Sequence, residues 1–153
     1  MVTRVLVLNG PNLNMLGTRE PEVYGRESLA DVRARTEKRA QTLGLTIDFR
    51  QSNHEGELVS WIQEARGKVA GIILNAGAFT HTSIAIQDAI AASECPLVEV
   101  HLSNIYRRET FRHHSYVAPV AIGVICGFGP LGYELAVEAL AEHLKKAKPT
   151  GGT

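Results

Sequence analysis

The sequence contains little cysteine and no surplus of charge of either sign. Its 153 residues include only two cysteines, Cys95 and Cys126, whose spacing fits neither a metal site nor a redox pair. We expect both to be free thiols in a reducing compartment. Lys and Arg together number 16, as do Asp and Glu, so the formal net charge is zero. A neutral chain has no general electrostatic attraction to nucleic acid or to an anionic membrane, and we expect neither as a partner.

Long apolar runs are absent as well. No stretch approaches the ~18 apolar residues of a membrane-spanning helix. The N-terminus carries only a short apolar block, Val5 to Leu8, which is too small for the apolar region of a secretory signal. We therefore expect a cytoplasmic protein.

Several patterns that indicate a particular chemistry are missing too. His54-Glu55 does not extend to the H-E-x-x-H of metalloproteases because position 58 is Leu, and the histidines show no metal-ligand spacing. The sequence has no P-loop and no G-x-S-x-G. Its lysines, at positions 38, 68, 145, 146 and 148, follow none of the predicted strands. We expect neither a metal site nor a Schiff-base mechanism, which needs a desolvated lysine.

Apolar, β-rich runs alternate with helical patterns from end to end. The predicted strands are 4–8, 45–50, 69–74, 97–102 and 121–126. The predicted helices are 28–43, which opens with a capping box at Ser28, 57–66, 82–92, and a last helix from Pro130. The apolar stripe of that last helix is formed by Leu135, Ala139, Leu140 and Leu144. The alternation predicts an α/β fold with a parallel sheet, in a single domain over 1–153 with a frayed tail at 145–153.

Polar side chains follow the predicted strands where ligands bind in open α/β sheets, beyond the carboxyl ends. The strand ends carry 9–12, 52–54, 75–77 and 101–104, which are rich in amides, hydroxyls and imidazole and contain no acidic cluster. Such a rim suits a polyhydroxylated or anionic small molecule. The loops 10–27 and 103–119 are long for this fold, and long ordered loops in compact domains are usually functional.

Glu99 and His101 stand two residues apart in the fourth predicted strand, so both side chains lie on one face of it. Burying a carboxylate without a partner is costly, which makes His101 the natural partner of Glu99. A carboxylate next to an imidazole fixes the tautomer and favours the protonated ring near neutral pH. The pair is therefore a candidate general acid, and a purely structural Glu–His pair is the alternative.

Two loops offer further candidates with open alternatives. Arg19 could stabilise the phenolate of Tyr24 and let it act as a base, although spacing alone favours an exposed tyrosine packed on an arginine. The loop after the fourth strand is basic, which is typical of nucleic-acid contacts or of an anion pocket. An isolated basic loop on a neutral chain without an aromatic array favours the anion pocket. Its basic residues are Arg107, Arg108, Arg112, His113 and His114.

Gly127-Phe-Gly129-Pro-Leu-Gly132 matches the dinucleotide fingerprint G-x-G-x-x-G. It lies in the last β–α unit, however, no acid-bearing strand follows it, and Pro130 removes one amide from the helix start. A structural turn is the favoured interpretation. A flavodoxin-like FMN- or nucleotide-binding protein remains the alternative function.

The sequence blocks at these strand ends resemble those of the type II 3-dehydroquinate dehydratases. Leu8-Asn-Gly-Pro-Asn-Leu-Asn14, with Leu16-Gly-Thr-Arg19 and Tyr24-Gly25, is similar to the N-terminal signature of this family. The later similar blocks are Gln51–Glu57, Asn75–Ser83, Glu99–Asn104 and Phe111–Ser115, together with Gly127-Phe-Gly129 and Gly132-Tyr133. The similarity covers nearly the whole chain in order. One departure is Tyr106-Arg107, where the family pattern has His-Ala.

The resemblance implies a flavodoxin-like three-layer sandwich whose five parallel strands follow the order 2-1-3-4-5. It also implies a lyase that dehydrates 3-dehydroquinate to 3-dehydroshikimate by anti elimination through an enol(ate), without metal or cofactor. This reaction serves the shikimate pathway of aromatic amino acid biosynthesis or quinate catabolism, and the sequence leaves both open.

The resemblance further implies catalytic roles. Tyr24, beside Arg19, would remove the proton next to the ketone, and Asn12 would hold a water against the enolate oxygen. His101, oriented by Glu99, would protonate the departing hydroxyl.

It assigns substrate binding to a second set of residues. Asn75 and the backbone amides of Leu102 and Ser103 would hold the carboxylate, and His81 and Arg112 the ring hydroxyls. Arg108 would support a closed lid. Asp88 would reach the site of a neighbouring subunit in a homo-oligomer, a dodecamer built as a tetramer of trimers.

Overall fold

The computed structural model describes residues 3–18, 22 and 26–147, and the structure of the chain is discussed for these residues only. They form one parallel sheet of five strands in the order β2-β1-β3-β4-β5, which confirms the predicted α/β fold and strand order. The strands are β1 (Thr3–Asn9), β2 (Leu45–Gln51), β3 (Gly71–Asn75), β4 (Leu97–His101) and β5 (Gly123–Cys126).

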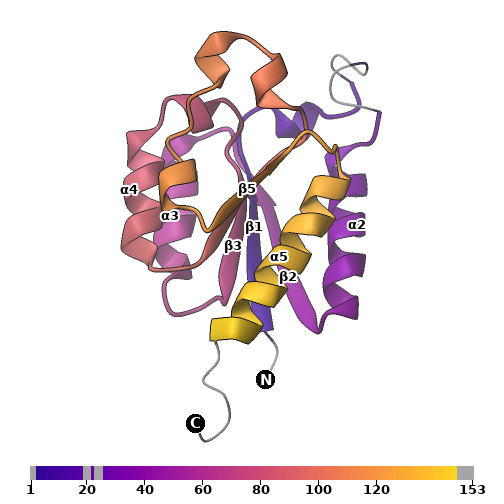
Figure 1. The fold of residues 1–153 in the computed structure, drawn as a ribbon, viewed down its shortest axis with the longest axis vertical. Coiled ribbons are helices and arrows are strands. Elements are labelled where there is room, and N and C mark those ends of the chain that lie inside the picture. Colours follow the sequence, from indigo (N-terminus) through magenta and orange to yellow (C-terminus); the bar gives the residue numbers. More distant parts are fainter. Residues whose placement is uncertain (1–2, 19–21, 23–25, 148–153) are drawn as a thin grey trace, which may run out of the picture.

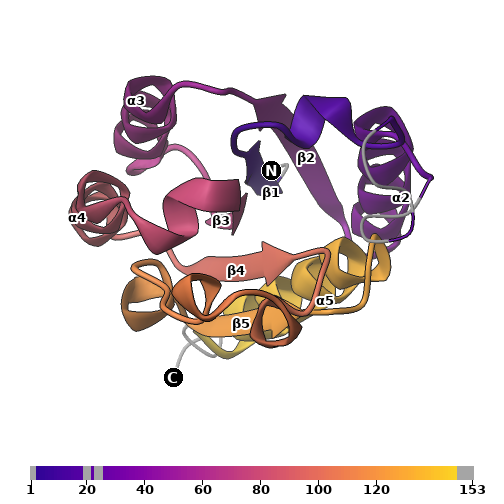
Figure 2. The ribbon, with the colours of Figure 1, turned by 90° about the horizontal axis from the view of Figure 1, so that it is seen from above.

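Four helices cover the two faces of the sheet (Figures 1 and 2). They are α2 (Leu29–Thr42), α3 (Glu55–Ala65), α4 (Ile84–Ser93) and α5 (Leu131–Ala147). α2 and α5 lie on one face, and α3 and α4 lie on the other (Figure 2). Alternate residues of the central strands therefore enter two separate cores: Val5 and Val7 face α2 and α5, whereas Leu6 and Leu8 face α3 and α4.

The capping box predicted at Ser28 is present. The Ser28 hydroxyl accepts a hydrogen bond from the Asp31 backbone N–H at 3.2 Å, and the Asp31 carboxylate accepts one from the Ser28 backbone N–H at 2.9 Å. These hydrogen bonds hold the pKa of Asp31 below its ordinary value. The box satisfies donors that a helix start would otherwise leave unpaired.

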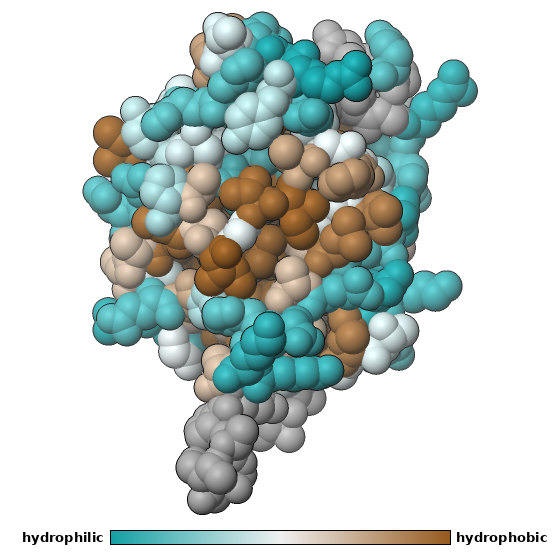
Figure 3. All heavy atoms as spheres, in the orientation of Figure 1, coloured by the Kyte–Doolittle hydropathy of each residue, from teal (hydrophilic) through white to brown (hydrophobic). Residues whose placement is uncertain are grey.

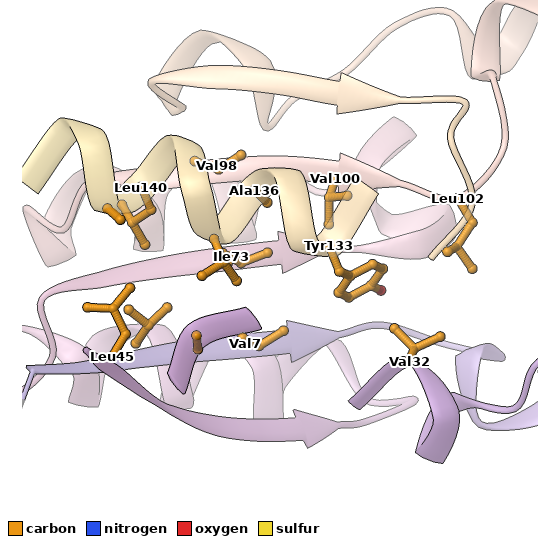
Figure 4. Close-up of a cluster of buried hydrophobic side chains, with 14 of the residues drawn as sticks. Val7, Val32, Leu45, Ile73, Val98, Val100, Leu102, Tyr133, Ala136 and Leu140 are labelled. Carbon is orange, nitrogen blue, oxygen red and sulfur yellow. The ribbon is translucent and has the colours of Figure 1, made fainter. Parts of the chain in front are cut away.

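The predicted apolar stripe of α5 is right for Leu140 and Leu144, which pack in or against the core, and wrong for Leu135 and Ala139. Of its four residues, Leu140 is buried, Leu135 and Leu144 are half-buried, and Ala139 is exposed. The face that packs on the sheet is instead formed by Gly132, Tyr133, Ala136, Val137, Leu140 and Ala141 (Figure 4). The helix also continues to Ala147, three residues into the segment expected to be a frayed tail, and 148–153 lie outside the described residues.

The described parts of the two long loops lie at the carboxyl edge of the sheet. The described part of the first contains a 3₁₀ turn at Leu13–Met15. The second contains three such turns, Ile105–Arg107, Thr110–Arg112 and Ala118–Val120. β5 consequently begins at residue 123 rather than at the predicted 121. None of the helices that the structure describes is long and apolar enough to span a membrane.

Candidate active site at the carboxyl edge of the sheet

A pocket lies at the carboxyl edge of the sheet, as the strand-end sequences predict. Its walls combine apolar side chains, among them Leu13, Leu16 and Ile105, with polar groups from three separate segments, at the ends of β1, β3 and β4 and in the loops that follow them. The predicted site residues that line it are Asn12, Asn75, His81, His101, Leu102, Ser103, Arg108 and Arg112.

A close approach between two strand ends brings Asn12 next to Asn75. The backbone N–H of Gly10 donates to the carbonyl of Asn75 at 2.8 Å. A Cβ atom at Gly10 would lie 2.3 Å from the carbonyl oxygen of Ala76, so only glycine fits here. Asn12 itself has a left-handed backbone, φ 69°, and its N–H donates to the side chain of Asn53 at 3.0 Å.

Glu99 and His101 form the hydrogen-bonded pair that their spacing predicts. β4 is buried along its whole length, and the exposed fractions of Glu99 and His101 are only 1% and 5%. Nε2 of His101 donates to Oε2 of Glu99. This bond fixes the imidazole and leaves Nδ1 as the ring nitrogen that can exchange a proton with a molecule in the pocket.

Ser115 holds the other side of this carboxylate. Its Oγ lies 3.0 Å from both Glu99 oxygens and also accepts the backbone N–H groups of Val117 and Ala118, at 3.1 and 3.0 Å. Because both lone pairs of the hydroxyl are occupied by these donors, its single proton must point to Glu99. The loop after β4 thus carries a serine that anchors the buried carboxylate.

His81 is held as a neutral acceptor. Its Nδ1 lies 2.8 Å from the carbonyl oxygen of His114, so Nδ1 carries the proton and donates it. Burial lowers the pKa of His81 from its ordinary 6.5, and nearby His101 and Arg112 lower it further, against the hydrogen bond to His114 and the charge of Glu99, which raise it. The neutral ring leaves Nε2 as a hydrogen-bond acceptor, which suits a hydroxyl of a bound molecule.

Arg112 supplies a fixed positive charge. Its Nε donates to Glu109 at 2.7 Å, and its guanidinium lies over the ring of Phe111, 5.2 Å from the centroid. The hydrogen bond from Arg112 holds the pKa of the Glu109 carboxyl below its ordinary value. Both contacts restrict the guanidinium, and its remaining N–H groups are available to the pocket.

The glycine-rich segment after β5 is a structural turn. The N–H groups of Gly127 and Gly129 donate to the carbonyls of His101 and Leu102 at 3.3 and 2.9 Å, so they are not aimed at a phosphate. No group of three or more His, Cys, Asp or Glu side chains within 3–18, 22 and 26–147 is arranged to hold a metal ion.

Comparison with known proteins shows to which family the chain belongs. A family model described as "Dehydroquinase class II" matches residues 3–141. The chain belongs to the class II dehydroquinases.

Individual relatives agree with this family. "3-dehydroquinate dehydratase 2" of Pseudomonas aeruginosa is 60% identical over 147 residues, which cover 96% of this chain and 99% of that protein. The 3-dehydroquinate dehydratase of Mesorhizobium japonicum is 63% identical over 141 residues, covering 92% and 98%. The crystal structure of the type II dehydroquinase from Propionibacterium acnes has a TM-score of 0.89 at 44% identity, covering 93% of this chain and 98% of that one. The resemblance, the fold and the enzyme class expected from the sequence are confirmed.

Among the described residues, two predicted site residues do not line the pocket of this class II dehydroquinase: Glu99, which contacts the lining residue His101, and Asp88. Arg19 and Tyr24 lie outside the described residues. Asp88 is exposed on α4 and does not line the pocket of its own chain.

Tyr106 and Arg107, which depart from the family pattern, do not line the pocket. Tyr106 is exposed and packs its ring near His113, 5.6 Å between centroids.

Two polar residues of this class II dehydroquinase lie in its sequence motifs, but their contacts could not be predicted from the sequence. Ser115 contacts Glu99, and Tyr133 contacts Asn9 and Asn75. In the sequence, both residues stand out only because they belong to blocks that are similar to those of the family. Their functions depend on contacts across 16 and 58 positions of the chain, which no local pattern reveals.

Proposed function

We propose that the chain converts 3-dehydroquinate to 3-dehydroshikimate by anti elimination through an enol(ate), as a step of the shikimate pathway. The observation that carries this proposal is the buried Glu99–His101 pair, whose His101 lines a pocket together with apolar side chains, neutral hydrogen-bonding groups and arginine. The family and the relatives named 3-dehydroquinate dehydratase support the same reaction.

His101 is the general acid of this proposal. The base removes a proton from the carbon next to the ketone, and the electrons pass into an enolate. When the enolate collapses, the bond from C1 to its hydroxyl breaks, the oxygen takes a proton from His101, and water leaves as the ring double bond forms. Glu99 keeps the charged imidazole stable inside the protein, since a buried cation needs a partner.

Tyr24 is the proposed base and Arg19 its partner, by resemblance to the family. The guanidinium would stabilise the phenolate, and a closed loop would exclude water and strengthen that attraction. Asn12 would hold a water molecule against the enolate oxygen, where the negative charge develops. Arg108, which lines the pocket, would support the closed loop.

The remaining pocket groups match the substrate's functional groups. Asn75 and the backbone amides of Leu102 and Ser103 would bind the carboxylate. Neutral His81 would accept a hydrogen bond from one ring hydroxyl, and Arg112 would donate to another. A carboxylate is bound best by several convergent donors, and a hydroxyl by one donor and one acceptor.

The proposed assembly is a homo-oligomer, a dodecamer built as a tetramer of trimers, in which Asp88 reaches a neighbouring subunit's site. The exposed position of Asp88, outside its own pocket, supports this. A large apolar surface is also available for contacts between copies: Ile122, Val124 and Leu131 are 45%, 43% and 41% exposed, over β5 and α5 (Figure 3). The cytoplasmic location expected from the sequence stays a prediction.

The decisive experiment is an absorbance assay with 3-dehydroquinate, because the product's new double bond is conjugated with the ketone. His101→Ala should lower kcat by about 10²–10⁴-fold with a much smaller change in KM, since a general acid acts in the transition state. His143→Ala, on the last turns of α5 and far from the pocket, is the matched control and should retain activity.

Wild-type turnover should also persist with EDTA and with borohydride. A His101→Ala variant that keeps most of its kcat would refute the assigned acid. A purified protein that absorbs visible light and fails to turn over 3-dehydroquinate would favour the FMN-binding alternative.

A further inference from the structure

Tyr133 is a fully buried tyrosine whose hydroxyl lies under the pocket. It comes from the first turn of α5, is 0% exposed, and packs among Val7, Ile73 and Val100 (Figure 4). Its hydroxyl contacts the last residues of two neighbouring strands, Asn9 of β1 and Asn75 of β3. A buried hydroxyl in an apolar core is costly unless it is hydrogen-bonded, and here both of its bonds go to amide side chains.

The direction of each bond in this network is fixed from one end. The side-chain nitrogen of Asn9 donates to the carbonyl of Arg50 at 2.9 Å, so Oδ1 of Asn9 is left as an acceptor. The Tyr133 hydroxyl donates to that oxygen at 2.5 Å. Burial raises the pKa of Tyr133 well above its ordinary value, so the hydroxyl keeps its proton at any working pH.

Asn75 is then allowed only one orientation of its amide. The Tyr133 oxygen has already committed its proton to Asn9, so it accepts from Nδ2 of Asn75 at 3.0 Å. On the other side, Oδ1 of Asn75 accepts the backbone N–H of Gly77 at 3.2 Å. A flipped amide would place an oxygen against the Tyr133 oxygen and an N–H against the Gly77 N–H, and both bonds would be lost.

One N–H of Asn75 remains after these contacts. Asn75 lines the pocket although it is only 3% exposed, and its Nδ2 carries two hydrogens, of which Tyr133 uses one. We propose that Tyr133 is a positioning residue that locks Asn75 with an N–H toward the pocket, so that this wall selects a carboxylate over a neutral carboxamide. The inference rests on the proposed function, in which Asn75 binds the substrate's carboxylate.

Tyr133→Phe tests this because it removes the hydroxyl and keeps the ring. Without the hydroxyl, only the Gly77 N–H still holds the amide, so Asn75 can turn its oxygen to the pocket at a smaller cost. KM for 3-dehydroquinate should rise about tenfold, with kcat within about twofold of wild type. Tyr106→Phe, which removes an exposed hydroxyl outside the pocket, is the matched control and should change neither constant.

The selective readout is equilibrium binding of 3-dehydroshikimate and of its carboxamide. Wild type should prefer the carboxylate, and Tyr133→Phe should lose most of that preference. The effect should vanish in an Asn75→Ala background, because Tyr133 acts through Asn75. A preference that survives Tyr133→Phe, or effects that simply add in the double variant, would overturn the inference and leave the hydroxyl a purely structural role.

A second variant covers the case in which Tyr133→Phe does not fold. Asn9→Ala keeps the tyrosine but removes the acceptor of its proton, so Tyr133 can donate to Asn75 and the amide is free to turn. It should also lose the carboxylate preference, and an unchanged preference would contradict the network. The binding assay needs no turnover, so a wild type that prefers the carboxylate but does not dehydrate 3-dehydroquinate would refute the proposed function and not this inference.

Discussion

The hydroxyl of Ser115 links the Glu99–His101 pair to the backbone of the loop after β4 through hydrogen bonds. The Ser115 hydroxyl donates its proton to Glu99, so Ser115→Ala should remove a hydrogen-bond donor from this buried carboxylate. Glu99 should then hold His101 less well in position. We expect kcat to fall about tenfold, about 1.4 kcal/mol, with KM nearly unchanged. Steady-state kinetics check this, and Ser115→Thr, which keeps the hydroxyl, should retain most of the activity.

The control for this prediction is Ser93→Ala. Ser93 is also a buried serine whose hydroxyl bonds only local backbone, the carbonyl of Ile90 and the N–H of Cys95, away from the pocket. If Ser115 acts through Glu99, the loss should be much smaller in a Glu99→Gln background. An equal loss in both backgrounds would show that Ser115 only stabilises the loop.

His81 gives a pH dependence whose sign can be worked out. Burial lowers its folded-state pKa below the ordinary 6.5, so between these two values the unfolded chain binds a proton that the folded chain does not. The free energy of unfolding should therefore fall as the pH drops through 6.5, until the folded-state pKa is reached. Urea unfolding across this range should show a steeper loss for wild type than for His81→Asn, which keeps a donor toward the His114 carbonyl. Parallel curves would count against a buried neutral His81.

For single residues, the sequence predicted a hydrogen-bonded pair within one strand but not the hydrogen-bond networks that join distant segments. The two-residue period of a strand places Glu99 and His101 on one face, and that prediction is confirmed. Ser115 and Tyr133 contact Glu99 and Asn75 from a loop and a helix that are distant in sequence. Only the packing of α5 on the sheet and the course of the loop after β4 bring their hydroxyls to the strand ends.

The helices and strands were predictable because their periods and caps are local. The capping box of α2 appears at the predicted Ser28, whereas the buried face of α5 follows the predicted stripe only in part. The reason is that α5 also carries apolar residues outside its buried face. Ala139 lies with Ile122 and Val124 beside β5 rather than in the core, and periodicity alone cannot tell these two faces apart.

Ser28→Ala tests the contribution of the capping box to one helix. Removing the side-chain acceptor leaves the Asp31 N–H unpaired, so the free energy of unfolding should fall by about 1 kcal/mol. Thermal unfolding should shift down by roughly 2–4 °C, measured at one protein concentration because assembly also stabilises the fold. Ser60→Ala, at an exposed position inside α3, should be neutral or slightly stabilising. Equal shifts in the two variants would argue against the cap.

For the whole molecule, the pocket of one chain is lined by His101, Asn75 and Arg112 but not by Asp88. The exposed aspartate on α4 and the apolar surface over β5 and α5 both lie outside it (Figure 3). The sequence predicted the oligomer mainly through the family resemblance, because the zero net charge favours self-association without identifying a contact between copies. Under the proposed assembly, a complete site therefore combines residues of more than one chain.

A mixing experiment separates a shared site from a site within one chain. Asp88→Ala and His101→Ala should each lose most of their activity. If the two variants are dissociated, mixed in equal amounts and reassembled, about a quarter of the sites should combine an intact His101 with an intact Asp88 from a neighbour. Absorbance assays should then recover activity in that proportion, whereas each variant reassembled alone stays inactive. Reassembly to full size on light scattering with no recovery would place Asp88 outside the neighbouring site.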